Sequence, residues 1–251
     1  MVLLFIDDQY MIDLFTLQVS EDKLHYNFKE ILNEPQPYVG ELLQSWTNGF
    51  FDRDNKFVKE FQTTFNSSFW ELYIFNVFKE YGFEIDFSKP YLDFIVNAPY
   101  QVTVEAVISN NAFNAVQEFT RSGYFDDLPR LEEIVRTATI RLTNAIVYKY
   151  KEKYKKIYSK EDCVKGKTFI LVVAPFEQPY FWEQTSRAIT HVLYGVKEFE
   201  YKDPNNRVAT EVQKCLFEYF IEKDNGSAIP LGFFSDSQIG CCTNEKYISR
   251  C

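Results

Sequence analysis

Three carboxylates lie alone in apolar runs between residues 69 and 110, and they constrain the fold more than any other feature of the sequence. Glu71 is the only charged residue in FWELYIFNVF, Asp93 the only one in YLDFIV, and Glu105 the only one in VTVEAVI. Burying a carboxylate without a partner costs several kcal/mol, which is comparable with the net stability of a whole domain. Three such residues in separate elements indicate that they converge on a common positive charge.

The residues around these acids predict a helix followed by three short strands. The helical pattern runs from about residue 57 to Gly82, which can adopt the left-handed conformation of a helix C-cap. Strands are predicted at 83–87, 91–96 and 101–109, separated by the turn sequences SKP and NAP. Alternation puts Asp93 on one face of the second strand and Glu105 on the more polar face of the third. A hairpin of these two strands would therefore bring the two carboxylates together.

A long helix and a buried strand are predicted next. Apolar residues at helical spacing run through residues 127–157, and KTFILVVAP is the continuous apolar run of a central strand. Another helix is predicted over 180–194, residues 208–221 fit a strand or a helix, and 227–234 fit a strand. This order of elements predicts an α/β sandwich with a mixed sheet.

The chain divides by pattern into three parts. Residues 1–56 carry helical spacing and are expected to form a helical N-terminal appendage, residues 57–240 the α/β domain, and residues 241–251 a frayed or truncated tail. In the loop FFDRDNKF, Arg53 and Asp54 are expected to form an ion pair or to cap the next helix, with a functional role as the alternative.

Charge and cysteine content narrow the functional classes. The net charge of −9 counts against a nucleic-acid partner, although a basic groove can coexist with an acidic body. Five cysteines without a CxxC pair, and two histidines, argue against a zinc site. The start MVLLFIDDQY lacks the basic region of a signal peptide, and no apolar run reaches membrane-spanning length. We therefore expect a cytoplasmic protein without a membrane partner.

A helix acid followed by two strand acids resembles the PD-(D/E)xK nuclease superfamily, the restriction-endonuclease-like fold. Glu71 in FWELY is similar to the helix acid of that family, Asp93 in YLDF to its aspartate, and Glu105 in VEA to its second acid. The resemblance covers residues 57–174 and extends to a branch of uncharacterised microbial proteins. It implies a restriction-endonuclease-like mixed β-sheet flanked by helices.

The resemblance also implies an activity. Asp93 and Glu105 would bind Mg²⁺ or Mn²⁺, with Glu71 assisting directly or through water, and the protein would hydrolyse DNA phosphodiesters. Mg²⁺ prefers such oxygen ligands, and a bound metal can activate water and stabilise charge on a phosphoryl oxygen. The expected partner is nucleic acid, with DNA first and a homodimer left open.

One position departs from the family motif. The motif places a lysine two residues after the second acid, where this chain has Val107. The candidates to replace that lysine are Asn110, Lys149 and Lys153. If none does, the alternative function is a catalytically degenerate nuclease fold that acts as a binding or assembly module.

The other signals each have a structural alternative. Lys149, Lys153 and Lys156 could bind nucleic-acid phosphates, or they could form the solvated end of a helix, which favours positive charge. Glu71 could reach solvent from a helix edge, and Asp93 and Glu105 could pair with neighbouring basic residues. His191 lies among apolar residues and is expected to be a packing histidine.

Overall fold

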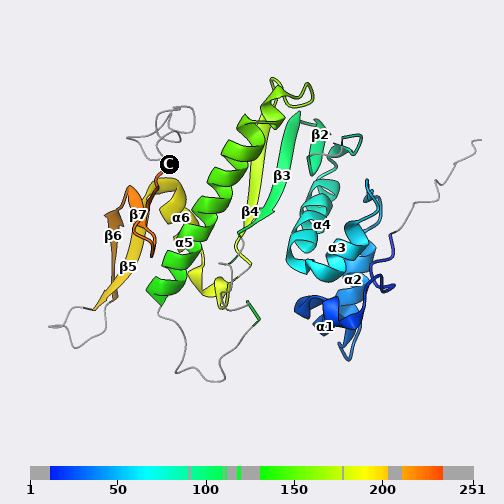
Figure 1. Cartoon of the computed structure of the whole chain (residues 1–251), viewed down its shortest axis with the longest axis horizontal. Coiled ribbons are helices and arrows are strands. Elements are labelled where there is room, and N and C mark those ends of the chain that lie inside the picture. Colours follow the sequence, from blue (N-terminus) through cyan, green and yellow to red (C-terminus); the bar gives the residue numbers. More distant parts are fainter. Residues whose placement is uncertain are drawn as a thin grey trace, which may run out of the picture. The chain divides into compact units, whose positions relative to one another are not determined.

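The computed structural model describes residues 12–89, 92–109, 111, 118–119, 131–176, 178–202 and 211–233. The chain divides into two compact units (Figure 1). Unit 1 comprises Met1–Ile108 and Lys156–Ala174, and unit 2 comprises Ser109–Lys155 and Pro175–Cys251. The chain therefore leaves unit 1 after one strand and returns to it for another.

Unit 1 begins with short helices and ends with a mixed sheet. Its helical elements are η1 (Glu21–Lys23), α1 (Tyr26–Leu32), α2 (Tyr38–Trp46), α3 (Phe57–Thr63), α4 (Phe65–Glu80) and η4 (Tyr158–Lys160). Its strands are β1 (Glu84–Asp86), β2 (Phe94–Ala98), β3 (Val102–Ile108) and β4 (Thr168–Ala174). Among the described residues these strands form one sheet in the order β1-β2-β3-β4.

The sheet of unit 1 combines an antiparallel meander with one parallel pair. The strands β1, β2 and β3 pair antiparallel in sequence order, and Phe94 lies opposite Val104. The strand β4 pairs parallel to β3, with Glu105 beside Leu171. The predicted class, a mixed α/β structure in which helices flank a mixed sheet, is confirmed at this level.

Helix α4 is the centre of unit 1, because it lies between the sheet and the N-terminal helices (Figure 1). Leu72 and Phe75 on this helix belong to one apolar core with Phe28 of α1 and with Phe94 and Val104 of the sheet. Because this single core joins α1 to the sheet, the N-terminal helices are packed into unit 1. The sequence places a boundary at residue 56, whereas the compact units divide the chain elsewhere.

Unit 2 contains a long helix and short antiparallel strand pairs. Its helical elements are α5 (Leu131–Tyr148), the π-helix η3 (Lys149–Lys155), η5 (Phe181–Gln184) and α6 (Arg187–Tyr194). Its strands are β5 (Val196–Lys202), β6 (Glu211–Phe217), β7 (Phe220–Glu222) and β8 (Ala228–Pro230). β5 pairs with β6, and β7 with β8. The helix α6 packs on α5 and is followed directly by β5.

Several predicted boundaries differ from the observed ones. The helix predicted from residue 57 is interrupted at Thr64, which has non-helical backbone angles and separates α3 from α4. The second strand begins at Phe94, so the prediction that Asp93 lies within it is wrong. Residues 211–217 form a strand, which decides an alternative that periodicity leaves open. Gly82 and Gly195 end their helices with positive φ as predicted.

None of the helices in the described part of the chain combines the length and the apolar character that a bilayer span requires.

Candidate functional site

Glu71 is held at the surface of the unit 1 core by the docking of α4. The preceding residue, Trp70, donates a hydrogen bond from Nε1 to the Val172 carbonyl of β4 at 3.0 Å, and the following residue, Leu72, is fully buried. The side chain of Glu71 is 23% exposed. The packing of its neighbours, rather than any bond of its own, therefore fixes where this carboxylate lies.

Asp93 lies at the entrance to β2, where its carboxylate is tied to the next strand. The Ala106 N–H donates to Asp93 Oδ2 at 2.7 Å. Asp93 immediately precedes Phe94, which lies opposite Val104 in the antiparallel pair. The buried side chains of Leu92 and Phe94 hold the backbone on both sides of Asp93. The hairpin that the sequence predicts is thus confirmed, although Asp93 precedes its strand.

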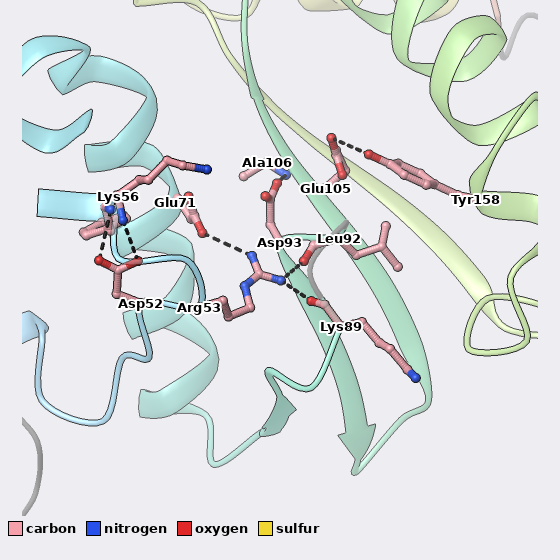
Figure 2. A network of polar contacts seen from close by, with 11 residues as sticks. Asp52, Arg53, Lys56, Glu71, Lys89, Leu92, Asp93, Glu105, Ala106 and Tyr158 are labelled. Atoms are coloured by element: carbon pink, nitrogen blue, oxygen red, sulfur yellow. Dashed lines mark hydrogen bonds and ion pairs between the residues drawn. The ribbon is translucent and has the colours of Figure 1, made fainter. Parts of the chain in front are cut away.

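Arg53 reaches the same place from the loop between α2 and α3. Its Nη1 donates to the Lys89 carbonyl at 2.7 Å and also to the Leu92 carbonyl. Its Nη2 lies 3.9 Å from Glu71 Oε1, and its side chain is 18% exposed. Figure 2 shows the guanidinium between Glu71 and the segment that leads into Asp93. The sequence favours a loop ion pair for Arg53, but the structure places it beside two of the predicted acids.

These three residues line one pocket of about 190 Å³. The remaining lining residues are aromatic or acidic: Phe50, Phe51, Phe57, Asp52, Asp54 and Glu60. Arg53 is the cation among the described residues that line this pocket. The pocket therefore presents several carboxylates to one guanidinium.

The burial of Glu71 and the excess of carboxylates in the pocket change the pKa of Glu71. The pKa of Glu71 is raised from 4.5 to about 8, first because burial disfavours its charged form and second because the Asp93 carboxylate is close. The Arg53 guanidinium acts in the opposite direction but does not compensate. At neutral pH the Glu71 carboxyl therefore holds a proton unless another cation enters the pocket.

The loop around Arg53 contains its own local contacts. Asp52 accepts from the Phe57 N–H at 3.0 Å and so caps the start of α3. Asp54 forms an exposed ion pair with Lys56 at 2.7 Å, which holds the pKa of Asp54 below its usual value. The ion pair of this loop thus joins Asp54 to Lys56, and the acceptor at the start of α3 is Asp52, so Arg53 and Asp54 do not form the ion pair or the cap that the sequence predicts for them.

Glu105 lies outside the pocket. Val104 and Ala106 pack in the core with α4, so alternation along β3 directs Glu105 and Val107 to the other face of the sheet. Glu105 is 4% exposed, and the Tyr158 hydroxyl lies 3.4 Å from its Oε1. In Figure 2 the Glu105 carboxylate turns toward Tyr158, and Asp93 turns toward the Ala106 backbone. That Asp93 and Glu105 share one metal ion stays a prediction.

The residues that line the pocket include possible ligands of a divalent cation. Mg²⁺ is commonly bound through one or two carboxylates, with water and substrate phosphate as further ligands. Glu71 and Asp93 supply two hard oxygen donors, and no soft ligand lines the described pocket. Among the described residues no group of three or more His, Cys, Asp or Glu could hold a metal ion. The donors fit a cation that keeps most of its water, but not one enclosed by protein ligands.

Of the predicted lysine substitutes, Lys149 and Lys153 are not among the described residues that line this pocket. Asn110 lies outside the described residues. Lys149 and Lys153 belong to the π-helix η3 of unit 2, whereas the acids lie in unit 1, and Lys156 follows η3 at the start of the returning segment of unit 1. The predicted nucleic-acid contacts of these three lysines stay predictions. Tyr150 and Tyr154 stack on each other in η3, with ring centroids 5.9 Å apart.

Arg53 is the functional residue that sequence reasoning undervalued. It is the single arginine in the first 120 residues, and it lies between two aspartates after a pair of phenylalanines. An isolated arginine in an aromatic-rich loop is a signal for a buried, hydrogen-bonded guanidinium. Its distance in sequence from Glu71 and Asp93 concealed the connection.

Unit 2 contains a second cluster of titratable groups, in which a buried histidine lies beside two partly exposed charged residues. His191 is buried as predicted, and its Nε2 lies 3.2 Å from Glu218 Oε2. The other oxygen of Glu218 lies 3.3 Å from Lys197 Nζ. Burial lowers the pKa of His191, with the Glu218 carboxylate acting in the opposite direction. One carboxylate is thus shared by an imidazole and an ammonium group.

Comparison with known protein families, curated proteins and solved structures finds no match to this chain.

Proposed function

We propose that this chain is a metal-dependent nuclease that hydrolyses DNA phosphodiester bonds on a restriction-endonuclease-like fold. The observation that carries the proposal is the pocket in which Glu71 and Asp93 lie beside the Arg53 guanidinium. These acids come from a helix and from the entrance to a strand, in the order that the nuclease resemblance implies. Hydrolysis of a phosphodiester requires stabilisation of negative charge on the phosphoryl oxygens.

The topology of unit 1 supports the proposed fold. A helix that carries an acid precedes three antiparallel strands, and a fourth strand pairs parallel to the third. A helix, α5, lies between the third and fourth strands in the sequence. This order of elements agrees with the core of the PD-(D/E)xK superfamily.

Each residue of the pocket has a distinct task in the proposed reaction. Asp93 is oriented by the Ala106 N–H and would bind the metal with Glu71, directly or through water. Mg²⁺ bound there would stabilise charge on the phosphoryl oxygen and lower the pKa of a water molecule. Glu71 binds a proton at neutral pH in the absence of a cation, so it would release that proton on metal binding. Phe50, Phe51 and Phe57 form the apolar part of the lining of this pocket.

The test is cleavage of plasmid and single-stranded DNA with Mg²⁺, Mn²⁺ or EDTA. We expect metal-dependent cleavage by the wild-type protein and a loss of about a thousandfold or more in Asp93→Ala, because the metal contributes several kcal/mol to the transition state. Lys56→Gln is the matched control, since Lys56 is exposed and pairs locally with Asp54. No metal-dependent cleavage, or equal cleavage by Asp93→Ala, would contradict the proposal.

A second candidate is a catalytically degenerate nuclease fold that binds nucleic acid or a protein partner. The position of Val107 favours it, because this side chain is buried where the motif has a lysine. Glu105 also favours this second candidate, because its carboxylate lies beside the Tyr158 hydroxyl and does not line the pocket with Asp93. In this case fluorescence anisotropy would detect DNA binding whose affinity falls steeply with salt concentration. The cleavage assay would show no product with any of the metals.

A further inference from the structure

We propose that Arg53 is a positioning residue of this pocket and that the N-terminal helical region thereby completes the site. This inference rests on the proposed function for its catalytic consequence, but its structural part can be tested alone. Arg53 lies before residue 57 and thus outside the segment that resembles the nuclease family. A loop between two helices would therefore determine the geometry of acids that belong to α4 and to the entrance of β2.

The first step of the argument is the set of atoms that the guanidinium joins. Nη1 donates to the carbonyls of Lys89 and Leu92, which flank the segment immediately before Asp93. Nη2 faces Glu71 of α4. Guanidinium donors have a fixed planar geometry, so the two carbonyls that accept from Nη1 are held relative to the Nη2 group, which lies at ion-pair distance from Glu71. Arg53 thus fixes the chain next to Asp93 with respect to Glu71.

The second step is the effect on the Asp93 carboxylate itself. Asp93 follows Leu92 directly, and its Oδ2 accepts from the Ala106 N–H at 2.7 Å. If Leu92 is released, Asp93 loses the backbone restraint that directs its side chain to Ala106. The Ala106 amide is therefore a reporter of how well Asp93 is positioned.

The third step is charge. Five carboxylates line the pocket with Arg53, which is the cation among its described lining residues. A guanidinium remains charged under all folding conditions and is weakly hydrated, so it tolerates a site that is mostly buried. A lysine would supply the charge, but its donors rotate on a flexible stem and are not fixed in one plane as those of the guanidinium are.

The experiment is amide hydrogen exchange on the full chain, measured at Ala106 and, as a reference, at buried Leu72 of α4. In Arg53→Gln we expect Ala106 to exchange about tenfold faster or more, since a hydrogen bond to a charged group contributes roughly 1.5–3 kcal/mol. Leu72 should change less than Ala106. Arg53→Lys should stay closer to Arg53→Gln than to wild type at Ala106. Asp93→Ala gives the upper limit of the effect, and Lys56→Gln should leave both amides unchanged.

Two results would overturn the inference. Exchange at Ala106 within twofold of wild type in Arg53→Gln, with acceleration in Asp93→Ala, would show that Arg53 does not position Asp93. Equal acceleration at Ala106 and Leu72 would show a general structural role. If Arg53→Gln does not fold, the comparison of Arg53→Lys with wild type at Ala106 decides between the same alternatives.

Activity separates this inference from the proposed function. If the wild-type protein cleaves DNA, Arg53→Gln should lower kcat about tenfold or more with KM changed by less than about threefold, because misplacement of catalytic groups acts on the transition state. A rise in KM alone would overturn the positioning role. If the wild-type protein does not cleave, the nuclease proposal fails while the exchange result at Ala106 still tests Arg53.

Discussion

Two clusters of titratable groups, one in each unit, shift the pKa of a side chain in opposite directions. In unit 1, Glu71 and Asp93 share a pocket with one guanidinium, and the pKa of Glu71 rises to about 8. In unit 2, one carboxylate, Glu218, is shared by His191 and Lys197, and the pKa of His191 falls. Burial disfavours the charged form of each group, but only in the first cluster do close negative charges add to this effect.

The two clusters differ in their charge balance. The unit 1 pocket can bind an added cation, whereas the carboxylate of the unit 2 cluster already has a partner within the protein on each oxygen. The unit 1 pocket has an excess of negative charge, so a cation that enters it gains an interaction that the protein alone does not provide. The unit 2 cluster has partners for its carboxylate on both oxygens. Perturbed pKa values accompany both functional sites and structural ion pairs, and here the charge balance distinguishes them.

The largest expected effect concerns Glu71 and alkaline pH. Its pKa is 4.5 when unperturbed and about 8 in the folded protein, so the folded state binds more protons in this window and stability falls as pH rises through it. Glu71→Gln should remove this loss and stabilise unit 1 by several kcal/mol at pH 8.5 relative to wild type. Protection factors of the Leu72 amide between pH 5 and 8.5 measure the difference. Parallel pH profiles of variant and wild type would contradict it.

The second effect is the response of the two units to a divalent cation. A ligand that binds the folded state stabilises it by about 2.7 kcal/mol at a concentration of 100 times its Kd. Mg²⁺ or Mn²⁺ should therefore raise amide protection in α4 of unit 1 but not at Val192 of unit 2. Asp93→Ala should abolish the response. Equal stabilisation of both units would indicate a nonspecific salt effect.

The third effect concerns His191 and acidic pH. Its pKa is lowered in the folded protein, so the unfolded state binds more protons below the ordinary value of 6.5 and stability falls as pH drops through 6.5. His191→Gln should reduce this acid-side loss of stability. Protection factors of the Val192 amide at pH 7 and pH 5 measure it. If His191→Gln and wild type lost the same stability between pH 7 and pH 5, His191 would not be the cause of that loss.

The smallest effect is expected at Tyr158. Its hydroxyl lies 3.4 Å from Glu105, which is at the long limit of a hydrogen bond. Tyr158→Phe should therefore change stability by about 1 kcal/mol or less and leave any metal-dependent cleavage within about twofold, because Glu105 does not line the pocket. Thermal unfolding and the plasmid assay check this. A large loss of cleavage would place Glu105 in the reaction, as the sequence predicts.

The fold was predictable where patterning is local and strong. The apolar run 167–175 forms β4 within one residue at each end, and residues 101–109 form β3. The position of Asp93 was less predictable, because β2 begins at Phe94, which is later than the alternation in the sequence suggests. The π-helix η3 was not predicted, since its lysines and tyrosines fit the spacing of an α-helix as well.

The sequence by itself determined which carboxylates are exceptional, because a lone acid in an apolar run is visible without coordinates. It also determined the hairpin in which β2 pairs with β3. Only the tertiary structure decided that Glu71 and Asp93 share a pocket, that Glu105 turns to Tyr158, and that Arg53 joins the first two. The physical reason is that side-chain direction at strand ends and contacts across many residues depend on packing, which local periodicity does not record.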